Sequence, residues 1–337
     1  MERNKIGLQI LKEIHKLNLN YCIARNFETF PIIGNDLDIF FDCDINFLTK
    51  IIKNICKQYD WVYFHNKKFS QWPQHNTVKT YSYFLFSKKK GLYENLQIDF
   101  FCGVSYFGQP ILTAKKIIEK YSFFDSKIGF NRTNNKLLGI LTAFQIEGLG
   151  RRKINMVKNQ KKIKRYMDIF ARNFNCISKN DENIFDDIFY LKLKDLKTLY
   201  KCSIKKDLYT FCRKISKLKI KLLIKILKKN PFSFFLLFLR RIIFLFKIYT
   251  FNAPGLIIYL DKVYIDLLDE INFQRIKILP NYINTFSPQN RKFLERSGVI
   301  IISKNKLKKD NLNNDMIIKE KTYLYKILLE TYEKSFN

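Results

Sequence analysis

The sequence predicts an α/β (α+β) fold: a mixed sheet with helices, followed by a helical segment and a small C-terminal α/β piece. In the first hundred or so of the 337 residues, the spacing of apolar residues changes repeatedly between helical and strand periods. Hydrophobic residues make up 47% of the chain, enough for a substantial core. None of the seven cysteines forms a C-x-x-C pair, which argues against a zinc or disulfide scaffold and favours reduced thiols.

The N-terminal region contains the clearest pattern. Apolar residues recur at helical spacing in two stretches, and four apolar or alternating runs indicate strands. The predicted helices are 5–17 and 45–59, and the predicted strands are 21–27, 36–42, 78–87 and 92–103. This order predicts a mixed sheet with helices on one face.

The rest of the chain is predicted to be mainly helical up to residue 230. The predicted helices there are 111–120, 133–147, 154–173, 183–200 and 205–229. Beyond them, we expect strands at 256–260 and 298–303 and helices at 262–271 and 321–334. We therefore expect three parts: a first domain over 1–125, a basic helical domain over 126–230, and an amphipathic segment with a small α/β region over 231–337.

The chain is strongly basic, with a formal net charge of +31 and a pI near 9.7. Such an excess favours a polyanionic partner, such as a nucleotide, nucleic acid or an acidic membrane. A coding bias toward AT-rich codons would also raise the Lys content. Five lysines spaced three or four apart form a stripe on the predicted helix 205–229: Lys214, Lys217, Lys221, Lys225 and Lys228.

The segment 231–251 is apolar but is interrupted by Arg240 and Arg241. Its uninterrupted apolar run is shorter than the roughly 20 residues that span a bilayer. Two placements remain open: in the headgroup layer with its cations, including Lys247, on anionic lipid, or buried against the last domain. The N-terminus has charges within its apolar stretch, which predicts an amphipathic helix and not a signal peptide.

The stretch GNDLDIFF at 34–41 contains the first two candidate site carboxylates. Because side chains two apart on a strand share a face, Asp36 and Asp38 project together. Gly34 precedes them and leaves space for a ligand to approach the backbone. Paired carboxylates beside such a space suit Mg²⁺, which prefers carboxylate and phosphate oxygens. A D-x-D pair is also common as a solvated strand face or a turn cap.

Asp99 is a third candidate, a lone acid among apolar residues in the run NLQIDFF at 95–101. A strand carrying it beside the first pair would supply the third carboxylate of a two-metal site.

This arrangement resembles the nucleotidyltransferase (DNA polymerase β-like) superfamily: a Gly-x-Asp-x-Asp strand, after a helix and a strand, with a later lone Asp. The run YCIARNFETFPIIGNDLDIFF is similar to uncharacterised bacterial nucleotidyltransferase-like proteins linked to surface polysaccharide genes. The resemblance covers about residues 5–105. It implies a nucleotidyltransferase-like domain, with two Mg²⁺ ions and a nucleoside triphosphate (NTP) as substrate.

By that resemblance, Asp36, Asp38 and Asp99 are the catalytic and metal-binding residues, and Gly34 lies in the nucleotide site. The turn that usually carries a Gly-Ser pair holds Arg25 and Asn26 here. Arg25 has two possible roles: a bidentate phosphate ligand, or an ion pair with an acid of the sheet. No G-x-x-x-x-G-K-[ST] loop occurs in the sequence, so kinase activity is not supported.

Three functions compete. The leading one is Mg²⁺-dependent transfer of a nucleotidyl group to an unknown hydroxyl acceptor, such as a sugar of a surface polysaccharide. The second is a catalytically degenerate basic module that binds RNA or an anionic membrane through 214–247, and the third, RNA nucleotidyl transfer, combines the two. For each we expect a cytoplasmic protein, with peripheral attachment to the inner membrane face in the membrane case.

Overall fold

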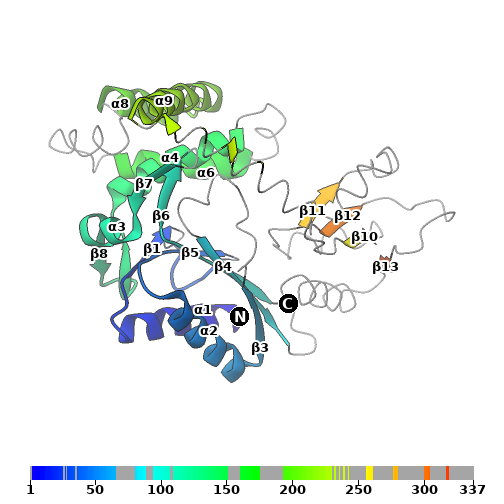
Figure 1. Ribbon diagram of the computed structural model, residues 1–337. Coiled ribbons are helices and arrows are strands. Elements are labelled where there is room, and N and C mark those ends of the chain that lie inside the picture. Colours follow the sequence, from blue (N-terminus) through cyan, green and yellow to red (C-terminus); the bar gives the residue numbers. More distant parts are fainter. Residues whose placement is uncertain are drawn as a thin grey trace.

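The computed structural model describes most of residues 2–65, 80–150, 160–174 and 193–242, and four later strands (Figure 1). Within these ranges 26, 28, 35, 89–93, 107–108, 230 and most positions after 232 are outside the described residues. The fold is mixed α/β. Its largest unit is a seven-stranded mixed sheet in the order β3-β4-β5-β2-β1-β9-β8.

The N-terminal elements alternate between helix and strand as the sequence predicts. They are α1 (Glu2–Lys16), β1 (Tyr21–Arg25), β2 (Asp36–Phe41), α2 (Ile45–Tyr59), β3 (Trp61–His65), β4 (Thr80–Ser87) and β5 (Asn95–Phe101). Strand β3 is an addition that the sequence analysis did not include. It follows α2 at once, because Asp60 ends that helix in the left-handed conformation.

Strands β5 and β2 are parallel neighbours at the centre of the sheet, and β1 and β4 flank them antiparallel. Two connections produce this order. The loop after β1 returns the chain directly into β2, whereas α2, β3 and β4 intervene before β5. The long connection between β2 and β5 is what permits their parallel pairing.

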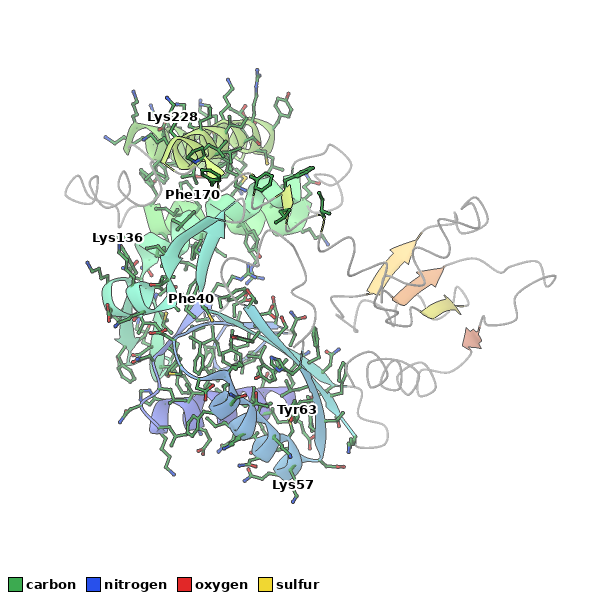
Figure 2. All side chains as sticks on the ribbon, viewed as in Figure 1. Phe40, Lys57, Tyr63, Lys136, Phe170 and Lys228 are labelled. Atoms are coloured by element: carbon green, nitrogen blue, oxygen red, sulfur yellow. The ribbon has the colours of Figure 1, made fainter. Side chains whose placement is uncertain are left out.

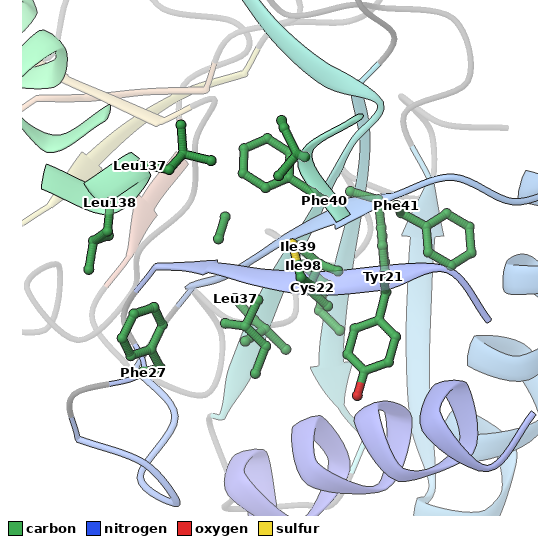
Figure 3. Close-up of a cluster of buried hydrophobic side chains, with 14 of the residues drawn as sticks. Tyr21, Cys22, Phe27, Leu37, Ile39, Phe40, Phe41, Ile98, Leu137 and Leu138 are labelled. Carbon is green, nitrogen blue, oxygen red and sulfur yellow. The ribbon is translucent and has the colours of Figure 1, made fainter. Parts of the chain in front are cut away.

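One face of the sheet is apolar and packs on the first two helices. The Tyr21 hydroxyl meets Nδ1 of His15 on α1 at 3.2 Å, and the Tyr83 hydroxyl meets Oγ1 of Thr49 on α2 at 2.7 Å. Figure 3 shows Tyr21 pointing toward α1 at the bottom of the view, while Leu137 and Leu138 of α4 lie on the other side of the strands. The fully buried Tyr21, Ile39, Phe41, Ile98 and Phe100 form much of this core.

The sheet extends further along the chain than residue 125. The elements after β5 are β6 (Gly103–Tyr106), β7 (Gln109–Thr113), α3 (Ala114–Tyr121), β8 (Ser122–Asp125) and β9 (Phe130–Thr133). The expected helix 111–120 is thus wrong at its start, where 111–113 belong to a strand. The sequence analysis also did not predict the β8–β9 hairpin, which joins the sheet because β9 pairs with β1. Its strands have four residues each, too few for periodicity to reveal.

Two further layers of helices cover the other side of the molecule. They are α4 (Asn135–Gly150), α6 (Gln160–Phe174), α8 (Leu193–Ile204) and α9 (Leu208–Lys229). Figure 1 shows α4 and α6 between the sheet and the outer pair α8 and α9. Phe170 of α6 and Phe211 of α9 are fully buried and meet edge to face at 5.6 Å, which joins the two layers. The predicted residues 154–159 and 183–192 lie outside the described part.

The described part of the C-terminal region is a second sheet. It consists of β10 (Leu256–Leu260), β11 (Ile276–Leu279), β12 (Ile300–Ser303) and β13 (Met316–Ile318), all paired in parallel in the order β11-β12-β10-β13. The strands expected at 256–260 and 298–303 correspond to β10 and β12. The helices expected at 262–271 and 321–334 lie outside the described residues.

Candidate functional site

A row of four polar side chains crosses four adjacent strands on the face of the sheet away from α1. Arg25 on β1 is opposite Asp38 on β2, Asp38 is opposite Asp99 on β5, and Asp99 is opposite Ser82 on β4. Directly opposed residues of neighbouring strands share a face. We call Arg25, Asp38, Asp99 and Ser82 the polar row.

A bulge in β1 puts Arg25 into this row. The pairing runs regularly to Ile23 opposite Ile39 and then shifts, so that Arg25 is opposite Asp38. Without the extra residue, that position would be occupied by Ala24. Bulges often redirect a side chain in this way beside functional sites.

Arg25 forms an ion pair with Asp38 from its Nε to Oδ2. The Asp38 side chain is only 1% exposed, whereas that of Arg25 is 26% exposed. Burial alone would lower the pKa of Arg25, but the charge and hydrogen bond of Asp38 outweigh it and raise the pKa above its ordinary value. Of Arg25's two possible roles, the structure therefore shows the ion pair.

The second oxygen of Asp38 has no such partner. Its Oδ1 is buried and accepts no hydrogen bond in the part of the chain that the structure describes. A buried carboxylate oxygen without a donor is costly and rare, so its presence requires an explanation. A bound cation or ligand is one way to satisfy it.

Asp99 is buried and accepts two hydrogen bonds. Ser82 donates from Oγ to Oδ1 at 2.5 Å, and Gln97 donates from Nε2 to Oδ2 at 2.8 Å. Burial, and next the negative charge of Asp38, raise the pKa of Asp99 to about 7, despite the two hydrogen bonds. Asp99 is thus poised to exchange a proton near neutral pH.

Asp36 lies two residues before Asp38 and so shares its face, at a half-buried position opposite Gln97. Tyr166 of α6 is buried close enough to sense the charges of Arg25, Asp36 and Asp38. Burial, more than these charges, raises the pKa of Tyr166. Helix α6 therefore brings a phenol near the acids.

The structure thus places Arg25, Asp36, Asp38 and Asp99 together. Gly34 is in the loop before them, where an added Cβ would lie 3.9 Å from Oδ1 of Asp36, an ordinary contact distance. The fold itself therefore does not require glycine at this position. Asn26 lies outside the described residues.

Three residues of the candidate site were not named as site residues from the sequence: Ser82, Gln97 and Tyr166. The first two carried a signal, because each is a polar residue in an otherwise apolar or aromatic run, and Gln97 shares the parity of Asp99. Tyr166 carried none, since its position depends on how α6 packs against the sheet.

The donor chemistry fits a hard divalent cation such as Mg²⁺, since the site offers carboxylate oxygens and one of them is buried without a donor. Across the described residues, however, no three His, Cys, Asp or Glu side chains are grouped closely enough to hold a metal ion. Arg25 already provides a positive charge at Asp38. The arrangement is that of a carboxylate pair in which Arg25 balances the charge of Asp38, and in which the pKa of Asp99 is raised to about 7.

A separate hollow of about 440 Å³ lies on the side of α1. Lysines 12, 16 and 127 line it over an apolar floor that includes Phe30 and Phe130. None of the polar row lines this hollow, so the acid chemistry lies elsewhere.

Comparisons with known proteins do not identify a family for this chain. No family model and no curated protein matches this chain. Among solved structures, the crystal structure of JHP933 from Helicobacter pylori matches at 12% identity and a TM-score of 0.31, covering 69% of this chain and 97% of that one.

Proposed function

We propose that this protein is a Mg²⁺-dependent nucleotidyltransferase that transfers a nucleotidyl group from an NTP to a hydroxyl acceptor. The observation that carries the proposal is the register of β2 and β5, which sets the buried Asp38 and Asp99 side by side. Two adjacent buried carboxylates repel each other, and a cation bound between them would remove that repulsion and would contact the Asp38 Oδ1 that accepts no hydrogen bond among the described residues.

Asp38 and Asp99 would hold Mg²⁺ together with phosphate oxygens, and the ion would neutralise charge on the triphosphate. Asp36, on the same face, would join them only after its side chain turns, because no three such acids of the described residues are grouped closely enough to hold an ion. Gly34 leaves room beside Asp36 for the nucleotide. Arg25 is one-quarter exposed, and its guanidinium can bind phosphate oxygens while its Nε stays on Asp38.

In the transfer step, the acceptor oxygen attacks the α-phosphorus in line. A P–O bond forms to the acceptor, the bond from the α-phosphorus to the bridging oxygen breaks, and pyrophosphate leaves with its electrons. The hydroxyl proton would pass to Asp99 as the general base.

The test is isothermal titration of the full chain with Mg²⁺ and each NTP. We expect binding that releases protons near pH 7, because a cation displaces the proton of Asp99. The heat should therefore depend on the ionisation enthalpy of the buffer. Asp38→Asn should weaken binding at least tenfold, whereas Asp42→Asn, the same change at an exposed position just after β2, should not.

Gly34→Ala is a second probe. The chain leaves room for the methyl group, so the fold should be unaffected, but the methyl would occupy the space beside Asp36 and weaken NTP binding. NTP binding that is absent, or that is insensitive to Asp38→Asn, would refute the enzyme.

A second candidate is a catalytically degenerate member of the same fold that serves as a basic binding module. The observation in its favour is the closed network: Arg25 already pairs with Asp38, and both oxygens of Asp99 accept hydrogen bonds. In that case Mg²⁺ would release no protons, and an anionic partner would still bind.

A further inference from the structure

The outermost helix, α9, exposes apolar side chains. Its inner side is buried on α4 and α8 through Phe211, Ile215, Leu218 and Leu222, among others. Its outward side carries Tyr209, Ile220 and Ile224, which are 59%, 56% and 47% exposed. The spacing of Tyr209, Ile220 and Ile224 puts them along one stripe of the helix. Exposed aliphatic residues grouped in this way usually mark an interaction surface.

Basic side chains lie beside this stripe. Exposed cations of α9 include Arg213, Lys217, Lys221, Lys225 and Lys228, and α9 contains no acidic residue. Figure 2 shows the side chains of this helix, with Lys228 labelled, projecting from the outer edge of the molecule. We call this surface, an apolar stripe with lysines along one side of it, the outer face of α9.

The chain after α9 continues the same pattern. At the described positions there, large apolar side chains are exposed: Phe232, Phe235, Phe238, Leu239 and Ile242. Their successive spacings are three, three, one and three residues, and Phe232 is the most exposed at 75%. Residues 240 and 241 between them are both arginine. At the described positions this segment is exposed, which disagrees with the placement buried against the last domain.

We infer that the outer face of α9, with the apolar residues of 232–242, binds the surface of an anionic lipid bilayer and lies in its plane. Among the described residues, no helix is long and apolar enough to cross a membrane. Aliphatic and aromatic side chains next to lysines are the composition of interfacial helices, whose apolar face enters the acyl boundary while the cations meet anionic headgroups.

Charge and side-chain type together select this partner. A second copy of the chain would bring an equally basic surface against this one, which like-charge repulsion disfavours. RNA would satisfy the lysines but not Ile220 and Ile224, since aliphatic side chains neither stack on bases nor contact phosphates well. An anionic bilayer satisfies both the cations and the aliphatic groups.

The test is co-sedimentation of the full chain with phosphatidylcholine vesicles, with and without about one-third phosphatidylglycerol. We expect binding to the anionic vesicles only, weakening as salt rises. The double variant Ile220→Ser/Ile224→Ser keeps the charge and should lower the partition coefficient at least tenfold, because it removes the buried apolar area. Lys217→Gln/Lys221→Gln should lower it by a similar factor, because it removes two cations that meet the anionic headgroups.

Ile32→Ser is the matched control, since Ile32 is 57% exposed on the N-terminal part of the molecule. It should bind vesicles like the unmodified protein, and circular dichroism should show all variants folded. Equal binding to neutral vesicles, or full binding by the Ile220→Ser/Ile224→Ser variant, would overturn the inference. Retention of single-stranded RNA instead of vesicles would also overturn it. NTP titration of the same variants reports separately on the proposed activity.

Discussion

The sheet and the outermost helix of this protein depart from ordinary burial in opposite directions. The sheet buries Asp38, Asp99 and Ser82 side by side, whereas α9 leaves Ile220 and Ile224 exposed to solvent. In both places, the chain bears a cost that packing alone would avoid. The proposed ligand at the sheet and the proposed anionic surface at the helix would each account for one of these costs.

The two costs differ in size. Buried carboxylates need compensation within the fold, and here it comes from Arg25, Ser82 and Gln97. Exposed aliphatic side chains need no such compensation. Their exposure only means that the fold does not gain the free energy of burying them. Substitutions in the polar row should therefore change the free energy of unfolding far more than substitutions on the outer face of α9.

The largest effect is expected for Arg25→Leu. Removing the cation leaves the buried Asp38 carboxylate uncompensated beside Asp99, which should cost about 3–5 kcal/mol in urea unfolding at pH 8. The double variant Arg25→Leu/Asp38→Leu should recover most of that loss, because it removes both charges together. A double variant as unstable as the single one would mean that Arg25 stabilises the fold by packing alone.

The second effect is pH-dependent. The pKa of Asp99 is about 7 in the folded protein and about 4 when unfolded. The folded state thus holds more protons between those values, and the contribution of Asp99 makes stability fall as the pH rises from about 4 to 7. Asp99→Asn removes this contribution.

We compare the free energy of urea unfolding of Asp99→Asn with that of the unmodified protein. The difference in favour of the variant should be larger at pH 8 than at pH 5 by about 2–4 kcal/mol, since each pKa unit is worth about 1.4 kcal/mol. Asp42→Asn, at an exposed position, is the control and should show no such pH dependence. If Asp99→Asn differs from the unmodified protein by the same free energy of unfolding at both pH values, the pKa of Asp99 is not raised.

The smallest effect on folding is expected for Ile220→Ser/Ile224→Ser. Both side chains are about half exposed, so the free energy of unfolding should change by less than about 1 kcal/mol. A loss of several kcal/mol would show instead that these residues pack on the protein, and the contrast between the two regions would disappear.

Much of the first hundred residues could be predicted because the signal there is local. Helices α1 and α2 have strong amphipathic periods, and Asp44 caps α2 by accepting from the backbone of Asn46. The shared face of Asp36 and Asp38 follows from the two-residue repeat of a strand. Short or weakly patterned elements were missed, as with β3 and the β8–β9 hairpin, because four or five residues show no clear period.

The sequence by itself determined which acids share a face, how basic the chain is and where its amphipathic helices lie, since these depend on composition and spacing. Only the tertiary structure decided that β2 and β5 are parallel neighbours in the register that opposes Asp38 to Asp99. It also decided that a bulge sets Arg25 against Asp38, and that Ile220 and Ile224 point away from the core. Strand partners, bulges and the choice of buried helix face depend on contacts between residues far apart in the chain, and no local pattern encodes them.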